Sequence, residues 1–145
     1  MEVTPLAGEV LFSIEGTLTV AHFAREKALV ATWQSMVTPK FREGLARGLN
    51  ECGRLGAPSW IVDLTLNPGV PSQADLTWIE SDAIELCELN QVRAIINIHG
   101  TSAVATMGAK RWSKSANANG LTTYDCRSLG DALALAAEVA SGKAA

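Results

Sequence analysis

Two short runs of almost continuous apolar residues constrain the fold of this chain more than any other feature. They are Ser59–Leu66 and Val92–His99, each eight residues long and each followed by a turn and a helix-like pattern. A strand that is apolar on both faces must be covered on both faces, which is typical of the central strands of a parallel sheet. The runs therefore predict an α/β fold with a buried sheet.

Helix-like segments alternate with these strands. Phe41, Leu45, Leu49 and Cys52 recur at helical spacing after Thr38 and Pro39, which suit an N-cap and a first turn. Ser72-Gln73-Ala74-Asp75 resembles a capping box that opens a second helix with a buried stripe at Leu76, Ile79, Ala83 and Leu86. A third helix follows Gly100-Thr101-Ser102 and frays from Ser113 to Asn119, and a fourth follows Ser128.

Three further β-rich stretches, Glu9–Glu15, Thr17–Phe23 and Ala28–Trp33, precede the first helix, and Leu121–Cys126 precedes the last. The order is β-β-β-α-β-α-β-α-β-α, and each β-α-β unit implies parallel neighbours joined by a right-handed crossover. We expect a mixed, mainly parallel sheet with antiparallel N-terminal strands, flanked by about four helices, in one domain over residues 1–145.

Composition narrows the class of partner. The net charge is −3, and the densest basic stretch, Lys110 to Lys114, is short, so nucleic-acid binding is not expected. No apolar stretch reaches the roughly 18 residues of a membrane span, and no signal peptide is recognisable. The three cysteines, Cys52, Cys87 and Cys126, are widely spaced and contain no CxxC pair. We expect no metal site, no cofactor and a cytoplasmic location.

The element order and several tracts carry a family resemblance. The tracts are Thr32 to Thr38, Trp60-Ile61-Val62-Asp63, and Ser72 to Ile79. Together they resemble a STAS domain, the fold of anti-sigma-factor antagonists, and the small bacterial proteins grouped as STAS/SEC14-like. The resemblance spans roughly residues 8–140 and implies a non-enzymatic module that binds a protein partner or another copy of itself.

In anti-sigma-factor antagonists, the loop after the corresponding strand carries a phosphorylated serine. Ser72 occupies that position here, without the preceding Asp and following Gly of the family's tract. Ser72 is therefore a candidate phosphorylation site as well as an N-cap, and the two roles are compatible. The resemblance makes the surrounding segment a candidate partner-binding surface, with Asn67, Pro68, Pro71, Asp75 and Trp78 as contacts.

A second candidate site is His99-Gly100-Thr101-Ser102, at the carboxyl end of a predicted parallel strand. Open α/β sheets bind ligands at such ends, and free N–H groups at a helix start suit an anion. An ordinary strand-to-helix turn is the alternative interpretation. This site belongs to a rival hypothesis, a SEC14-like carrier that holds an apolar or anionic molecule between sheet and helices.

Motifs for enzymes are absent from the sequence. It contains no GxSxG or HExxH, and the spacing of its two histidines, His22 and His99, nominates no nucleophile partner. An enzyme with an unfamiliar site is the weakest of the three hypotheses. We expect a binding or regulatory protein.

Overall fold

The computed structural model describes residues 8–142. The strands in this part of the chain are β1 (Glu9–Ile14), β2 (Leu18–Phe23), β3 (Ala28–Trp33), β4 (Ser59–Asp63), β5 (Ala94–Ile98) and β6 (Thr122–Cys126). The helices are α1 (Lys40–Leu55), α2 (Gln73–Trp78), the π-helical turn η1 (Ile79–Ala83), α3 (Ile84–Leu89), α4 (Ala103–Ala118) and α5 (Leu129–Ser141). Because α2, η1 and α3 follow one another without a gap, they form one continuous helix.

The six strands form a single sheet in sequence order, β1-β2-β3-β4-β5-β6. The pairs β1–β2 and β2–β3 are antiparallel, whereas β3–β4, β4–β5 and β5–β6 are parallel. The structure thus confirms the predicted mixed α/β class with its antiparallel N-terminal section.

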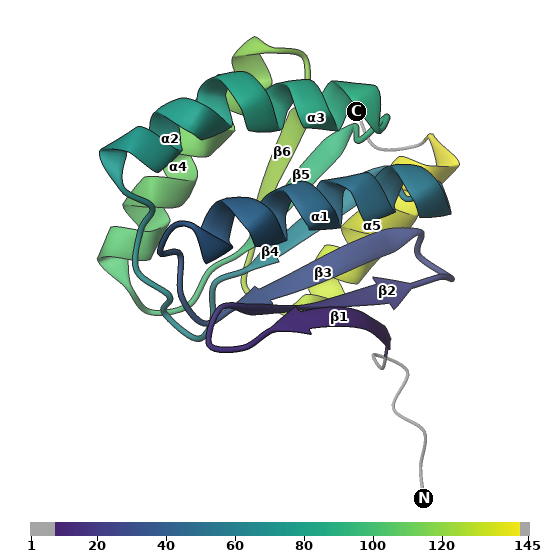
Figure 1. Ribbon diagram of the computed structural model, residues 1–145. Helices are drawn as coiled ribbons and strands as arrows, with labels where there is room; N and C mark the ends of the chain where they lie inside the picture. Colours follow the sequence, from purple (N-terminus) through teal and green to yellow (C-terminus); the bar gives the residue numbers. More distant parts are fainter. Residues whose placement is uncertain (1–7, 143–145) are drawn as a thin grey trace, which may run out of the picture.

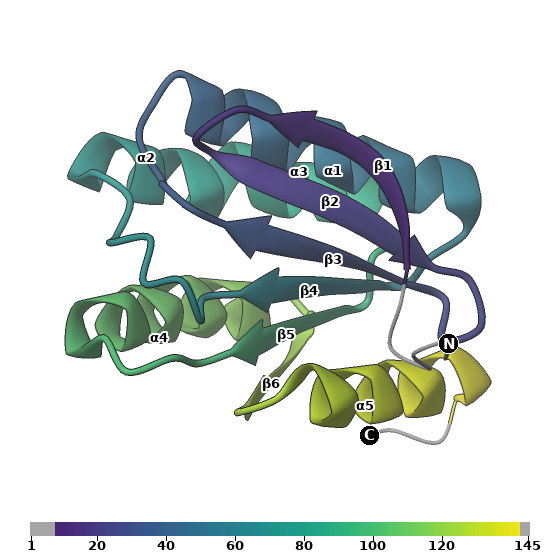
Figure 2. The same cartoon turned by 90° about the horizontal axis from the view of Figure 1, so that it is seen from below.

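The helices are divided unequally between the two faces of the sheet. Each right-handed crossover steps to the next strand in the same direction, so α1, the α2–η1–α3 helix and α4 all lie on one face. Figure 1 shows these three helices over the sheet, and Figure 2 shows α5 on the opposite side. The larger core therefore lies under three helices, and a smaller one lies under α5.

Three expected boundaries are corrected, one by a local turn and two by tertiary contacts. The strand predicted to reach Leu66 ends at Asp63, whose carboxylate accepts hydrogen bonds from the backbone and hydroxyl of Thr65 and turns the chain out of the sheet. Thr38 does not cap α1, whose N-cap is Pro39, because the Thr38 hydroxyl donates to Asp75. The helix expected to fray from Ser113 continues to Ala118, since Ser113 is buried and accepts a hydrogen bond from Asn97.

The aromatic residues follow the expectation of core packing with one partial exception. Trp33, Trp60 and Trp112 are buried, and Trp33 packs against Phe41 with ring centroids 5.2 Å apart. Trp78 is only half-buried. These side chains pack between the sheet and its three-helix face.

Candidate functional site

The carboxyl ends of β3, β4 and β5 lie at one edge of the sheet because these strands are parallel. The loops that leave them, residues 34–39, 64–72 and 99–102, lead into α1, α2 and α4. Both candidate sites from the sequence fall within these loops and the helix starts that follow. The structure therefore brings together two segments that the sequence nominated separately.

Ser72 is the N-cap of α2. Its backbone is extended, with φ −62° and ψ 164°, and its hydroxyl oxygen accepts a hydrogen bond from the Asp75 amide at 3.1 Å. The residue is also exposed to solvent. Capping uses one lone pair of the hydroxyl and leaves the oxygen accessible, so the cap and a modifiable serine coexist at this position.

Asp75 connects the start of α2 to α1 and is not an exposed contact. Its side chain is 1% exposed, and its Oδ1 accepts hydrogen bonds from Nε of Arg42 at 2.5 Å and from the Thr38 hydroxyl at 3.2 Å. Its Oδ2 is buried and has no partner. The Asp75 carboxylate therefore anchors the Ser72 loop to α1. In a capping box it would instead have accepted a hydrogen bond from the backbone N–H of Ser72.

Trp78 belongs to the same anchor. Its ring meets Phe41 edge-on at 6.4 Å between centroids, and the Arg42 guanidinium lies 5.5 Å above its centroid. The partner-binding role proposed for Trp78 requires an exposed ring, and here the ring is mostly covered. Its place off the apolar stripe reflects this packing between α1 and α2.

The remaining partner candidates shape the loop of residues 64–72. Asn67 is exposed and adopts a left-handed backbone with φ 54°, while Pro68 is half-buried and Pro71 is buried. The Asn67 amide donates to the Thr101 hydroxyl at 3.5 Å, and a Cβ on Gly100 would lie 3.0 Å from the carbonyl oxygen of Leu64. The two loops are therefore packed against each other.

The turn at residues 99–102 fits an ordinary strand-to-helix connection better than an anion cradle. Ser102 is the N-cap of α4 and accepts a hydrogen bond from the Ala105 amide at 3.2 Å. Ligand crevices of open α/β sheets form where the strand order reverses, and this sheet runs in one direction from β3 to β6. The fold thus lacks the switch point that makes such turns binding sites.

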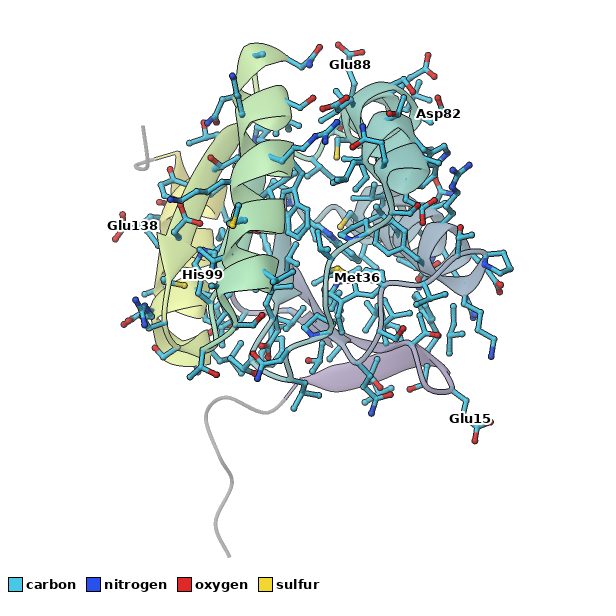
Figure 3. The ribbon with its side chains drawn as sticks, turned by 90° about the vertical axis from the view of Figure 1, so that its left-hand side faces the viewer. Glu15, Met36, Asp82, Glu88, His99 and Glu138 are labelled. Carbon is cyan, nitrogen blue, oxygen red and sulfur yellow. The ribbon has the colours of Figure 1, made fainter. Side chains whose placement is uncertain are left out.

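A polar network behind this turn was not recognised in the sequence. Asn97, fully buried on β5, accepts a hydrogen bond from the Trp112 indole and donates to Ser113 and, at 3.3 Å, to Asp125. Nε2 of His99 lies 2.6 Å from the same Asp125 oxygen, while Nδ1 of His99 is buried without a partner. Figure 3 shows His99 beside the first turns of α4. The signal available in the sequence was a single Asn within Ile-Ile-Asn-Ile.

The His99–Asp125 pair is not accompanied by an activated thiol. Cys126 follows Asp125 on β6, and burial is the largest cause that raises the pKa of its thiol, with Asp131, Asp125 and Asp63 adding to the shift. A thiol with a raised pKa is a weak nucleophile at neutral pH. The hydrogen bonds of this network join β5, β6 and α4.

Exposed apolar side chains concentrate at the carboxyl-end edge. Of seven large hydrophobic residues exposed within residues 8–142, five follow the carboxyl ends of β3, β4 and β5. We call these five the carboxyl-end patch: Val37 (69% exposed), Leu66 (55%), Val70 (40%), Val104 (55%) and Met107 (69%). Val70 lies against Gly108 on α4, where an added Cβ would come within 2.6 Å of it, so the loop and α4 form one surface.

An apolar cavity of about 50 Å³ lies between the sheet and the three-helix face. Met36, labelled in Figure 3, is one of its lining residues. The cavity is lined by Trp33, Met36, Phe41, Leu45, Leu49, Trp60, Val62, Ile79, Ala83, Ile84, Cys87, Ile95 and Trp112. It is separate from the carboxyl-end patch, which shares none of these residues.

Within residues 8–142, no group of three or more His, Cys, Asp or Glu side chains is placed to hold a metal ion. Across the same residues, every helix is too short or too polar to cross a bilayer. No known protein family, curated protein or solved structure matches this chain. The resemblance to STAS domains therefore rests on the sequence tracts themselves.

Proposed function

We propose that this chain is a non-enzymatic, STAS-like interaction module that docks a protein partner on the carboxyl-end patch. The observation that supports this proposal is the concentration of five of the seven exposed large hydrophobic residues on one edge. Single exposed apolar side chains are common, but a concentration of them on two neighbouring loops and the start of α4 is typical of an interaction surface. The loop is also well anchored through Asp75, so the patch is preorganised.

The charges beside the patch favour an acidic partner. Helix α4 carries Lys110, Arg111 and Lys114 and no Asp or Glu, and its exposed Val104 and Met107 precede them on the same helix. A second copy of this chain offers no acidic side chain on its own α4 to pair with these basic groups, so self-association through α4 gains no charge complementarity. The partner that fits best is a protein segment with apolar side chains flanked by carboxylates.

Ser72 supplies a means of regulation in this proposal. Arg111 donates to the side chain of Gln73 at 2.8 Å and to the Glu80 carboxylate at 3.5 Å, so α4 brings a cation, shared with one carboxylate, to the residue next to Ser72. A phosphoryl group on Ser72 would add about two negative charges at that point and would neutralise the attraction for an acidic partner. Phosphorylation is thus expected to release the partner.

Two substitutions on exposed residues test the docking surface. Met107→Glu places a charge in the patch, whereas Leu89→Glu places the same charge on a 73%-exposed residue at the end of α3, outside the patch. A partner captured from the source cell with the wild-type chain is purified, and its affinity for each variant is measured by calorimetry. We expect Met107→Glu to weaken binding about tenfold or more and Leu89→Glu to leave it unchanged. Equal losses in both variants would contradict the proposal.

The regulatory part has its own matched control. Ser128 is an exposed N-cap of α5 that accepts a hydrogen bond from the Asp131 amide at 3.1 Å, the same arrangement as Ser72. After incubation with ATP and the cell's kinases, we expect phosphate by mass spectrometry in the wild type and in Ser128→Ala but not in Ser72→Ala. Unchanged labelling of Ser72→Ala would remove Ser72 as the acceptor.

The proposed setting is the cytoplasm of a bacterium. The three cysteines are all free, and two of them are buried, which suits a reducing compartment.

A second candidate function, a small-ligand carrier, is supported by the apolar cavity. Its volume of about 50 Å³ exceeds the roughly 10–15 Å³ that one water needs and is about a third of a cavity that takes up benzene. Long-chain lipids are therefore too large for it in this conformation. The lining contains no charged side chain, so a neutral ligand is favoured over an anionic one.

A further inference from the structure

The two methionines within residues 8–142 differ in how far an oxidant can reach them. Met107 on α4 is 69% exposed, whereas Met36 is 3% exposed and lines the apolar cavity. Two-electron oxidants such as peroxides convert the thioether of methionine to a sulfoxide, and this reaction needs access to the sulfur. Of these two side chains, Met107 is therefore the one that such an oxidant converts first.

The three thiols of the chain are poor targets for the same oxidants. Cys52 and Cys87 are buried, and burial raises the pKa of both thiols, that of Cys87 to about 12. Burial is also the largest cause that raises the pKa of the Cys126 thiol. Because the thiolate is the reactive form, all three react slowly at neutral pH. A thioether has no proton to lose, so Met107 carries no such restriction.

The position of Met107 makes its polarity important for docking. It belongs to the carboxyl-end patch, one helical turn after Val104, and it is the more exposed of the two side chains that α4 adds to the patch. The next residue, Gly108, is buried and lies against Val70 of the loop over residues 64–72. A sulfoxide at this place would put a strongly hydrated oxygen on an apolar surface, and a partner that covers it would have to strip that water.

We propose that Met107 is a reversible oxidation site and that its conversion to the sulfoxide releases the docked partner. The inference rests on the proposed docking function and adds a second means of regulation to it. The Met107 sulfur attacks one oxygen of a peroxide, and the O–O bond breaks as the S–O bond forms. The displaced oxygen takes the proton of the transferred one and leaves as water when the peroxide is hydrogen peroxide. Sulfur loses two electrons, which the peroxide gains, and methionine sulfoxide reductases reverse the change.

Hydrogen peroxide is the probe for the site itself. The full-length chain is treated at about pH 6, where the thiolate fraction is smaller still and the thioether is unaffected. Mass spectrometry of proteolytic peptides then gives the rate at which each methionine gains an oxygen atom. We expect Met107 to react at least several-fold faster than Met36, with the same rate in Cys126→Ser, which lacks the half-buried thiol. Equal rates for the two methionines would overturn the proposal.

The effect on docking is measured by calorimetry with the partner protein purified by its retention on the wild-type chain. We expect the chain with Met107 fully oxidised to bind about fivefold or more weakly, and to recover its affinity after treatment with the two methionine sulfoxide reductases, one for each epimer. The control is Met107→Leu, which keeps an apolar side chain without sulfur. It should bind as the wild type does, both before and after peroxide.

The outcomes separate the inference from the function on which it rests. An unchanged affinity of the oxidised chain, in a system where Met107→Glu weakens binding, would overturn the oxidation site and leave the docking surface intact. The same loss of affinity after peroxide in Met107→Leu would assign the effect to another residue and would also overturn the inference. Full affinity in both the oxidised chain and Met107→Glu would overturn the inference and the docking surface together.

Discussion

Breaking the Arg42–Asp75 pair should destabilise the fold far more than breaking an exposed pair on the same helix. Arg42→Met leaves a carboxylate that is 1% exposed with only the Thr38 hydroxyl as a partner. Loss of one member of a fully buried pair costs roughly 3–5 kcal/mol, and that of a surface pair about 0–1 kcal/mol. Because the Arg42 side chain is 39% exposed, we expect an intermediate loss of about 2–3 kcal/mol.

The matched control is Arg54→Met. Arg54 is also on α1 and pairs with Glu51 at 2.5 Å, but its side chain is 60% exposed. Urea unfolding followed by tryptophan fluorescence measures both variants, and thermal melts should show a fall of roughly 8 °C for Arg42→Met. Arg54→Met should be indistinguishable from the wild type.

A double variant tests the physical reason. Arg42→Met combined with Asp75→Leu removes the buried charge along with its partner, so most of the loss should be recovered, to within about 1 kcal/mol of the wild type. Equal effects of Arg42→Met and Arg54→Met would refute the argument that burial of Asp75 sets the magnitude. A double variant as unstable as the sum of the single ones would refute it as well.

Three other perturbations have defined outcomes. Ser72→Ala should lose about 1 kcal/mol of unfolding free energy in urea, and a loss indistinguishable from zero would contradict the capping role. Asn97→Leu should lower the free energy of unfolding by roughly 2–3 kcal/mol, because it leaves the buried Trp112 indole and the Ser113 hydroxyl without their hydrogen-bond partner. A loss of less than about 0.5 kcal/mol would contradict this. Burial raises the pKa of the Cys87 thiol to about 12 from 9.0. The stabilisation from burying the neutral Cys87 thiol is therefore present below pH 9 and is lost as the pH rises from 9 towards 12. The free energy of unfolding should thus fall by about 1 kcal/mol less between pH 8 and 10 in Cys87→Ala than in the wild type. An identical fall in both proteins would count against this.

The local and periodic features of this fold were predictable from the sequence. The runs around Ile61 and Ile96 indicated central parallel strands because only a strand covered on both faces can be apolar throughout. Ser72, Ser102 and Ser128 were recognisable as helix starts because a short polar side chain before an apolar stripe can cap the first turn. The sheet class followed from the order of these elements.

The functional surfaces depended on contacts between distant residues. The sequence predicted Asp75 as a capping-box residue, but its carboxylate accepts a hydrogen bond from Arg42, 33 positions earlier in the chain. Trp78 looked like an exposed anchor because its packing partner Phe41 lies on another helix. The exposure of Met107 is likewise a product of tertiary packing, which a single sequence does not encode in any short pattern.

Oxidation of Met107 in the presence of the purified partner tests the docking surface most directly. Met107 is 69% exposed and Met36 only 3%, so hydrogen peroxide should convert Met107 rapidly and Met36 slowly in the free chain. Mass spectrometry of the peptide that contains Met107 gives the rate with and without the partner. If the carboxyl-end patch is the docking surface, binding should slow Met107 oxidation several-fold and leave the Met36 rate unchanged. An unchanged Met107 rate in a saturated complex would contradict it.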